Sequence, residues 1–155
     1  MNRAAFEVRP ATIRDALELA RLRYAFRTEL DTPTEGKPAF IERCTTWMRE
    51  QLNPAGAWRC WVAVARTSLV GTAWLQLIEK LPNPVGHLGR HGYVSSVYVV
   101  PPLRNAGIGS ALLNACLAEA RALGIDALFL WPTDRSRALY ERHGFKAPTD
   151  LLERR

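Results

Sequence analysis

The residues best suited to bind an anion lie in one short stretch, Val99–Leu113, with the sequence VVPPLRNAGIGSALL. Arg104 supplies a fixed positive charge and Ser110 a hydroxyl group. Gly107 and Gly109 have no side chain to keep a ligand away from the backbone. A β-branched run precedes these glycines, and a helical pattern follows them. Because free N–H groups and the helix dipole favour an anion at a helix start, the stretch predicts a phosphate-binding turn.

The glycine spacing separates this turn from two common nucleotide-binding motifs. No Gly-Lys-Ser or Gly-Lys-Thr follows it, as a P-loop requires, and the third glycine of a dinucleotide fingerprint falls at Leu112. Taken alone, the turn also fits a plain connection between a strand and a helix. Its assignment therefore depends on the surrounding elements and on a second motif.

The hydrophobic pattern predicts two helices and a hairpin before the turn. Phe6–Leu30 fits a short strand and an amphipathic helix that starts with a capping box at Thr12 and Asp15. A second helix is predicted from Pro38 to about Leu52. The runs WRCWVAVAR and SLVGTAWLQLIE predict an antiparallel hairpin, because both are rich in β-branched and aromatic residues and a short turn separates them.

The second half of the chain places the glycine turn between a strand and a helix. Lys80–Gly92 is rich in proline and glycine and is predicted as a loop, after which YVSSVYVV is predicted as a strand. A helix is predicted from about Gly107 to Leu123. DALFLWP then predicts a fifth strand, RSRALYERH a short helix ended by Gly144, and FKA a last short strand.

These elements predict an α+β, or mixed α/β, fold with a mostly antiparallel central sheet flanked by about four helices. One parallel strand–helix–strand unit is expected from Tyr93 to Trp131. The chain has 155 residues and no internal repeat or linker, so a single domain over residues 1–155 is expected.

The composition argues against several classes of protein. The net charge is +6, but the 21 basic residues form no long block, which disfavours nucleic acid as a partner. No apolar run is long enough to span a membrane, and MNRAAFEVRP has no apolar signal core. The cysteines, Cys44, Cys60 and Cys116, lack metal-ligand spacing and are expected to be free core thiols. We therefore expect a cytoplasmic protein without a metal site.

Two motifs together resemble a known family. Arg104, Gly107 and Gly109 form an Arg-x-x-Gly-x-Gly pattern, preceded by VYVVPP and followed further along the chain by SRALYERHGF. This combination resembles the GNAT superfamily of acetyl-CoA-dependent N-acetyltransferases. The order of the predicted elements is similar to that fold from Phe6 to Ala147. The resemblance implies a GNAT-like sheet with splayed fourth and fifth strands, and acetyl-CoA as the cosubstrate.

The resemblance also implies which residues bind coenzyme A. The pyrophosphate would be held by Arg104 and by the backbone of a short segment comprising Asn105, Gly107, Gly109 and Ser110. The Val97 N–H would face the thioester carbonyl, and Val99 would pair with the pantetheine arm. Thr133 stands where many relatives carry a pantetheine-binding asparagine.

Tyr140 in ALYERHGF matches a tyrosine that lies near the cofactor sulfur in many relatives. A phenol with a pKa of about 10 suits the protonation of a leaving thiolate. The residue that accepts the proton of the amine is left open by the sequence. Many relatives use a carboxylate on the fourth strand, but here Tyr93 occupies that position. Glu79 and His91 are candidates, as is a water chain through the hydroxyl groups of the strand.

The acceptor is expected to be an amine, and a small molecule is favoured. Glu29, Asp31 and Glu35 cluster before the second helix and are candidates for binding a cationic, polyamine-like substrate; a solvated turn is the plainer interpretation. The predicted function is direct acetyl transfer in a ternary complex. The alternatives are a protein or peptide N-terminal acetyltransferase and a non-catalytic acyl-CoA-binding module. The resemblance is compatible with a homodimer but does not fix the oligomeric state.

Overall fold

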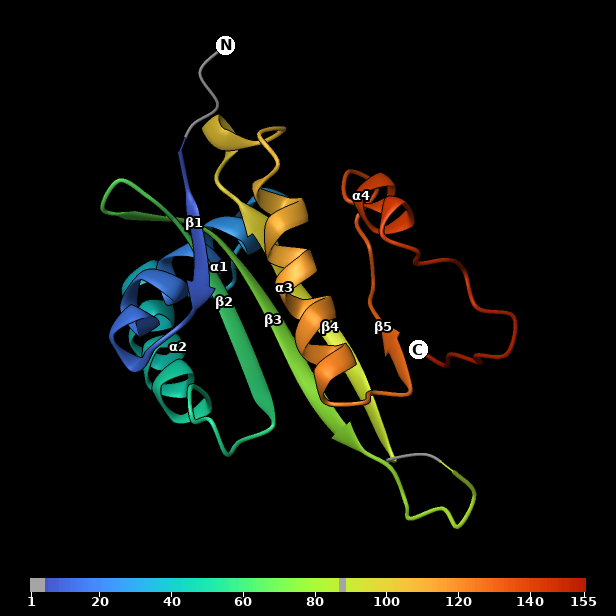
Figure 1. The fold of residues 1–155 in the computed structure, drawn as a ribbon. Helices are drawn as coiled ribbons and strands as arrows, with labels where there is room; N and C mark the ends of the chain where they lie inside the picture. Colours follow the sequence, from blue (N-terminus) through green and yellow to red (C-terminus); the bar gives the residue numbers. More distant parts are fainter. Residues whose placement is uncertain (1–4, 87–88) are drawn as a thin grey trace.

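The computed structural model describes residues 5–86 and 89–155. Its centre is a five-stranded sheet with the order β1-β2-β3-β4-β5, in which only β4 and β5 run parallel (Figure 1). The strands are β1 (Glu7–Pro10), β2 (Trp58–Ala65), β3 (Ser68–Glu79), β4 (Arg90–Val99) and β5 (Ala127–Phe129). The predicted mixed fold and antiparallel hairpin are confirmed.

Helices cover both faces of the sheet (Figure 1). They are α1 (Ala16–Leu30), α2 (Lys37–Gln51), α3 (Ile108–Ala122) and α4 (Arg137–Arg142). Strand β2 shows why two layers form, since its successive side chains point to opposite faces. Cys60 and Val62 join the core with α1 and α2, whereas Trp61 and Ala63 join the core with α3.

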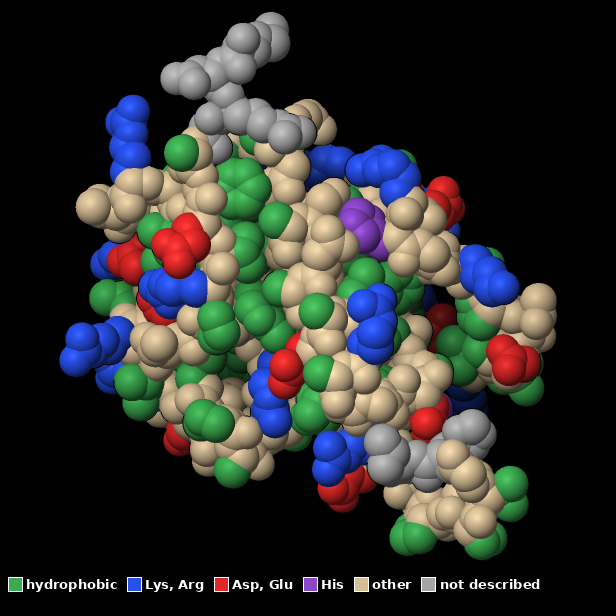
Figure 2. Space-filling model, viewed as in Figure 1, with side chains coloured by type: hydrophobic (Ala, Val, Ile, Leu, Met, Phe, Trp, Pro, Cys, Tyr) green, Lys and Arg blue, Asp and Glu red, His purple; other side chains and the backbone are tan. Residues whose placement is uncertain are grey.

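The capping box at the first helix and the buried, free cysteines are as predicted. The Thr12 N–H donates to Asp15 Oδ2 at 2.7 Å, which gives half of the capping box directly. Cys44, Cys60 and Cys116 are all buried and free. In the described part of the chain, no helix is long and apolar enough to cross a membrane. On the face shown in Figure 2, the basic side chains are scattered rather than gathered in one patch.

Two element boundaries and one predicted strand differ from the prediction. Strand β4 already begins at Arg90, so the loop predicted over Lys80–Gly92 is too long; part of it, residues 87–88, lies outside the described residues. The predicted fifth strand is shortened to Ala127–Phe129 because it pairs with β4 at only three positions. The segment FKA is not a strand, and Phe145 packs on the ring of Tyr140 instead.

The short pairing of β4 with β5 is what opens the sheet. Gly92 lies opposite Leu128 and leaves no room there for a larger side chain. Beyond the Tyr93–Phe129 pair no further pairing of the two strands follows. The gap that results is lined by side chains from the last part of β4, from α4 and from the start of α3.

Candidate active site

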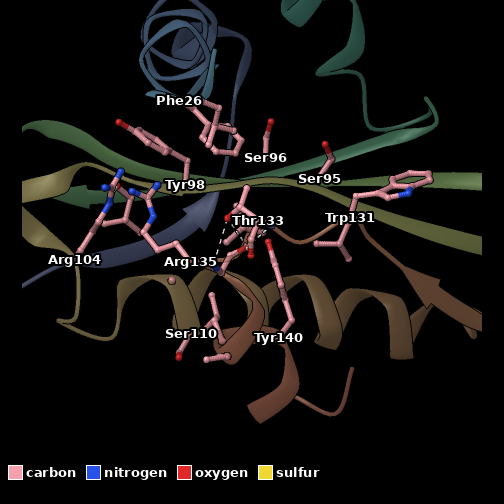
Figure 3. Close-up of a pocket in the computed structure, with 18 of the residues that line it drawn as sticks. Phe26, Ser95, Ser96, Tyr98, Arg104, Ser110, Trp131, Thr133, Arg135 and Tyr140 are labelled. Atoms are coloured by element: carbon pink, nitrogen blue, oxygen red, sulfur yellow. Dashed lines mark hydrogen bonds between the residues drawn. The ribbon is translucent and has the colours of Figure 1, made fainter. Parts of the chain in front are cut away.

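A cavity of about 530 Å³ lies where β4 and β5 separate (Figure 3). Figure 3 shows Arg104 and Arg135 at one end and Trp131 at the other, with Tyr140 between them. Most candidate residues from the sequence line this one cavity: Tyr93, Val97, Val99, Arg104, Asn105, Gly107, Gly109, Ser110, Thr133 and Tyr140. The structure therefore brings together two motifs that are separate in the sequence.

The glycine turn has the backbone geometry of an anion site. Gly107 has φ +89° and is the N-cap of α3, and a Cβ atom added there would meet nothing within 4 Å. Asn105 also lies in the left-handed region, at φ +62°, which asparagine tolerates better than most residues. The first N–H groups of α3 have no partner within the helix. They start at this turn, next to a cavity that the side chains leave open.

Strand β4 carries a bulge at the middle of the cavity. Its register with β3 pairs Trp74 with Ser95 but Thr72 with Tyr98, so two residues of β4 oppose one residue of β3. Ser96 has φ +51°, a left-handed conformation that few non-glycine residues adopt. A bulge leaves its extra residue outside the regular ladder and redirects the backbone. Main-chain groups near Val97 are thereby freed from pairing, at the position expected to face a thioester.

Arg104 is held in place by three contacts. Its Nε donates to the Val99 carbonyl at 2.9 Å, its Nη2 donates to Glu29 Oε2 at 2.8 Å, and its guanidinium lies over the Tyr98 ring at 5.5 Å. Glu29 also accepts hydrogen bonds from Tyr98 and Arg135, at 2.7 and 3.2 Å. Burial alone would raise the pKa of Glu29, but these three hydrogen-bonding partners outweigh it and lower that pKa.

Tyr140 projects from α4 toward β4 (Figure 3). It is 8% exposed, its ring packs on Phe145, and burial raises its pKa to about 12. Thr133 lies nearby and forms hydrogen bonds with Ser136. Its N–H and its hydroxyl both donate to Ser136 Oγ at 2.9 Å. Thr133 thus stabilises the turn before α4, a role that the sequence did not suggest.

The proposed proton acceptors divide into two groups. Tyr93 lines the cavity, together with Ser95 and Ser96 of the same strand. His91 lies within β4, in register with Ile78, and Glu79 is exposed at the end of β3. Neither lines the cavity, and among the described residues no Asp, Glu or His side chain does so.

The three carboxylates that were expected to hold the acceptor do not form one cluster. Glu29 does not line the cavity but binds Arg104, which does. Asp31 is exposed and lies 3.5 Å from Arg27, and Glu35 pairs with Arg43 at 2.6 Å. Each carboxylate thus already has a basic partner within the chain.

A second cavity, of about 420 Å³, adjoins the first on the side of α1 and α2. Arg23, Tyr93, Ser95 and Ser96 line both cavities. The rest of its wall is mostly aromatic or apolar: Phe40, Cys44, Trp47, Met48, Trp58 and Trp74, with Arg43. No local sequence pattern connects the residues of this wall, because they come from α2, β2 and β3.

One signal for the missing residues was present in the sequence. Arg23, Phe26, Arg27 and Leu30 follow helical spacing along α1, and all four line the first cavity. This stripe is distinct from the apolar stripe that packs α1 on the sheet. A helix with a second stripe of mixed Arg and apolar residues is a candidate for a site wall.

The comparisons with known proteins agree with this geometry. The chain matches the model of the acetyltransferase (GNAT) family over residues 18–145. A mycothiol acetyltransferase of Thermobispora bispora is 30% identical over 136 residues, which cover 83% of this chain and 43% of that protein. This chain thus spans less than half the length of that curated relative.

Solved structures resemble the chain over nearly its full length. A GCN5-related N-acetyltransferase of Ralstonia eutropha JMP134 is 29% identical, with a TM-score of 0.79, over 97% of this chain and 98% of that one. A predicted acetyltransferase of Clostridium acetobutylicum, crystallised with acetyl-CoA, shares the fold with a TM-score of 0.82 at 22% identity, over 97% and 96% of the two chains. The family match over most of the residues shows that this chain belongs to the GNAT family of acetyltransferases.

Proposed function

We propose that the protein transfers the acetyl group of acetyl-CoA to the amine of a small molecule by direct attack. The observation that carries this proposal is the meeting of the glycine turn, the bulge in β4 and Tyr140 in one cavity. These features would supply a site for the phosphates, free main-chain groups for the thioester and a proton donor for the sulfur. Membership of the GNAT family supports the choice of acetyl-CoA.

The pyrophosphate would bind at the start of α3. Backbone N–H groups from Asn105 to Ser110 surround the open turn, and Arg104 adds a charge that Val99 and Glu29 keep in place. The exposed main chain of β4 beyond the bulge would pair with the pantetheine arm, as an added strand does. Val97 would donate its N–H to the thioester carbonyl, whose oxygen becomes more negative during attack.

The reaction needs one proton donor and one proton acceptor. The amine nitrogen forms a bond to the carbonyl carbon, the C–S bond breaks, and its electron pair stays on sulfur. Tyr140 would donate to that sulfur. With a pKa of about 12 it stays protonated at neutral pH, and burial disfavours the thiolate for the same reason that it disfavours the phenolate. Tyr140 therefore acts as a hydrogen-bond donor that passes on its proton as the thiolate forms.

The attacking nitrogen must lose a proton to give the amide. Since no Asp, Glu or His side chain lines either cavity in the described residues, we assign this step to water held by Tyr93, Ser95 and Ser96. The proton leaves through this water to the solvent, and the solvent returns a proton to Tyr140, so the tyrosine is regenerated after each turnover.

In the part of the chain that the structure describes, no carboxylate lines either cavity, and this also favours a second function, an acyl-CoA-binding module that does not catalyse transfer. Thiol release from acetyl-CoA in the presence of varied amines separates the two functions. We expect amine-dependent release, with an N-acetylated product detected by mass spectrometry. Tight binding of acetyl-CoA without release for any amine would support the binding module. Release with peptides but not with small amines would support a peptide acetyltransferase instead.

A further inference from the structure

Three tryptophan rings form part of the wall of the second cavity. Trp47 contacts Trp58 and Trp74 with ring centroids 5.5 and 5.9 Å apart, and Trp58 contacts Trp74 edge to face at 5.9 Å. Trp74 is 4% exposed, but Trp47 is 40% exposed although it belongs to this cluster. Binding is favourable when an apolar ligand covers a large exposed indole on the wall of a cavity, because the apolar surface of both is then removed from water.

Arg23 stands where the two cavities meet. Its Nη1 donates to Ser96 Oγ, on the bulge of β4, at 2.8 Å. Among the described residues no carboxylate lies within ion-pair distance of Arg23. Burial, and then the nearby Arg27, lower the pKa of Arg23. A guanidinium in this state is stabilised by an anion that enters the cavity.

The other charge on this wall is also positive. Arg43 lines the second cavity and is bound by Glu35 through two hydrogen bonds, at 2.6 and 3.2 Å, on the exposed side. Tryptophan faces attract cations as well as apolar groups. A purely cationic acceptor would nevertheless meet Arg23 directly beside the reacting position, without a carboxylate to balance it.

We propose that the acceptor is an amino acid with a large apolar or aromatic side chain, whose α-carboxylate binds Arg23. This inference rests on the proposed acetyl transfer and names its substrate class. The aromatic side chain fills the cavity of Trp47, Trp58 and Trp74. The amino group and the carboxylate of an α-amino acid are attached to the same carbon atom. A carboxylate bound to Arg23 therefore places the amine beside Ser96 and the adjoining thioester position. The product is the N-acetyl amino acid and free coenzyme A.

The first test compares acceptors that differ by one group. L-Phenylalanine carries both the carboxylate and the ring, phenethylamine lacks the carboxylate, L-alanine lacks the ring, and spermidine is a cationic chain. We expect kcat/KM for L-phenylalanine to exceed that for phenethylamine and for L-alanine by at least about tenfold, with spermidine lowest. Turnover of phenethylamine or spermidine at or above the rate of L-phenylalanine would overturn the inference while supporting the acetyltransferase function.

The second test removes the charge of Arg23. Arg23→Gln is expected to lower kcat/KM for L-phenylalanine by about 10- to 100-fold and to reduce the preference over phenethylamine to nearly one. Arg23→Lys should restore part of that preference. Arg21→Gln, on the same helix but exposed and paired with Glu18, is the matched control and should change neither value. An equal loss for both acceptors in Arg23→Gln would assign Arg23 a merely structural role and contradict the inference.

A binding measurement makes the result independent of turnover. Because three of the five tryptophans of the chain lie on the cavity wall, L-phenylalanine should change the intrinsic fluorescence of the protein. The change should be lost in Arg23→Gln and reduced in Trp47→Ala. If L-phenylalanine binds in this way but no acceptor is acetylated, the proposed transfer fails and the carboxylate site stands. If neither L-phenylalanine nor N-acetyl-L-phenylalanine binds, the substrate class is wrong.

Discussion

The two ends of the candidate site are built from different parts of the chain. At the proposed cofactor end, the groups available to an anion are main-chain N–H groups within residues 105–110, next to the start of α3. At the proposed acceptor end, the wall consists of side chains from α1, α2, β2 and β3, with Arg23, Trp47, Trp58 and Trp74 as its main members. The first end is formed by the backbone of one short segment, and the second by side chains that are far apart in the sequence.

The charges at the two ends are balanced differently as well. Arg104 and Arg135 share the carboxylate of Glu29, so the cofactor end holds its cations in fixed positions. Arg23 at the acceptor end has a hydroxyl partner, Ser96, and no carboxylate among the described residues. The end whose arginines are paired with a carboxylate is suited to a cofactor that the whole family shares. The end with an arginine that has no carboxylate partner favours ligands with a negative charge, and such a difference can give one member of a fold family its own specificity.

The largest effect is expected from a change in the backbone turn. Gly109→Glu places a carboxylate where the pyrophosphate would bind, and we expect acetyl-CoA affinity to fall by about 1,000-fold through the loss of charge-assisted hydrogen bonds. Isothermal titration calorimetry with acetyl-CoA measures this. Gly109→Ala is the matched control, because its Cβ would lie 3.4 Å from Leu139 Cδ2 and 3.9 Å from Val99 Cγ2, both ordinary contacts.

A normal affinity in Gly109→Glu would show that the turn is only a connection. The cofactor end would then lose the property that distinguishes it from the acceptor end. A glutamate in the first turn is favourable for the helix itself, so loss of the fold is not expected to complicate the result.

The next effect concerns the residue between the two ends. Tyr140→Phe keeps the ring packing on Phe145 and removes the hydroxyl, so kcat should fall by about 100-fold while acetyl-CoA affinity stays the same. Steady-state kinetics with calorimetry separates these quantities. Because burial raises the pKa of Tyr140 to about 12, the hydroxyl stays protonated below that value, and wild-type kcat should show no decrease from its ionisation up to about pH 10.

The difference between the two ends also decides what the sequence could reveal. Arg104, Gly107 and Gly109 are neighbours in the chain, and a glycine-rich turn between a strand and a helix is recognisable from local pattern alone. The motif of Tyr140 has a fixed place in the resemblance, which is why the sequence could predict that this residue lies at the cavity. The succession of strands and helices along the chain could be predicted from apolar runs and turn residues. These features could be predicted because the residues that form each of them lie close together in the sequence.

The acceptor end could not be derived in this way. Trp47, Trp58 and Trp74 belong to three elements, and only the packing of α2 over the hairpin brings them together. The acidic residues before α2 were candidates for binding the acceptor because they lie close together in the sequence. In the structure, however, Glu29 binds Arg104 and Glu35 binds Arg43. Proximity in sequence does not fix which partner a long charged side chain selects. The segment FKA reflects the same limit, because its residue types suit a strand but it pairs with no strand in the structure.

A smaller effect is expected at Glu29, and it tests which end this residue serves. Glu29→Gln keeps an oxygen that can accept from Arg104 but removes a negative charge close to the expected phosphate position. We expect KM for acetyl-CoA to fall by about threefold at low salt, because an anion binds more tightly where like charge has been removed. The acceptor KM should not change. Asp31→Asn is the control, since Asp31 is exposed and should affect neither constant.

A rise in the acceptor KM of Glu29→Gln would return this carboxylate to the acceptor end. It would also remove the contrast in charge balance between the two ends, because a negative group would then face the amine.

The smallest effects are expected at His91 and Glu79, the two proton acceptors that the sequence suggested. Neither lines a cavity, and at a rise of about 3.3 Å per residue, His91 lies about 13 Å from Ser95 along β4. A general base must reach the proton directly or through one water molecule. His91→Gln and Glu79→Gln should therefore change kcat by less than twofold and leave the pH profile unaltered, whereas Ser96→Ala should lower kcat. A tenfold loss of kcat in His91→Gln would place the base outside the described cavities. The acceptor end would then depend on a titrating side chain rather than on Arg23, the hydroxyl groups of β4 and water.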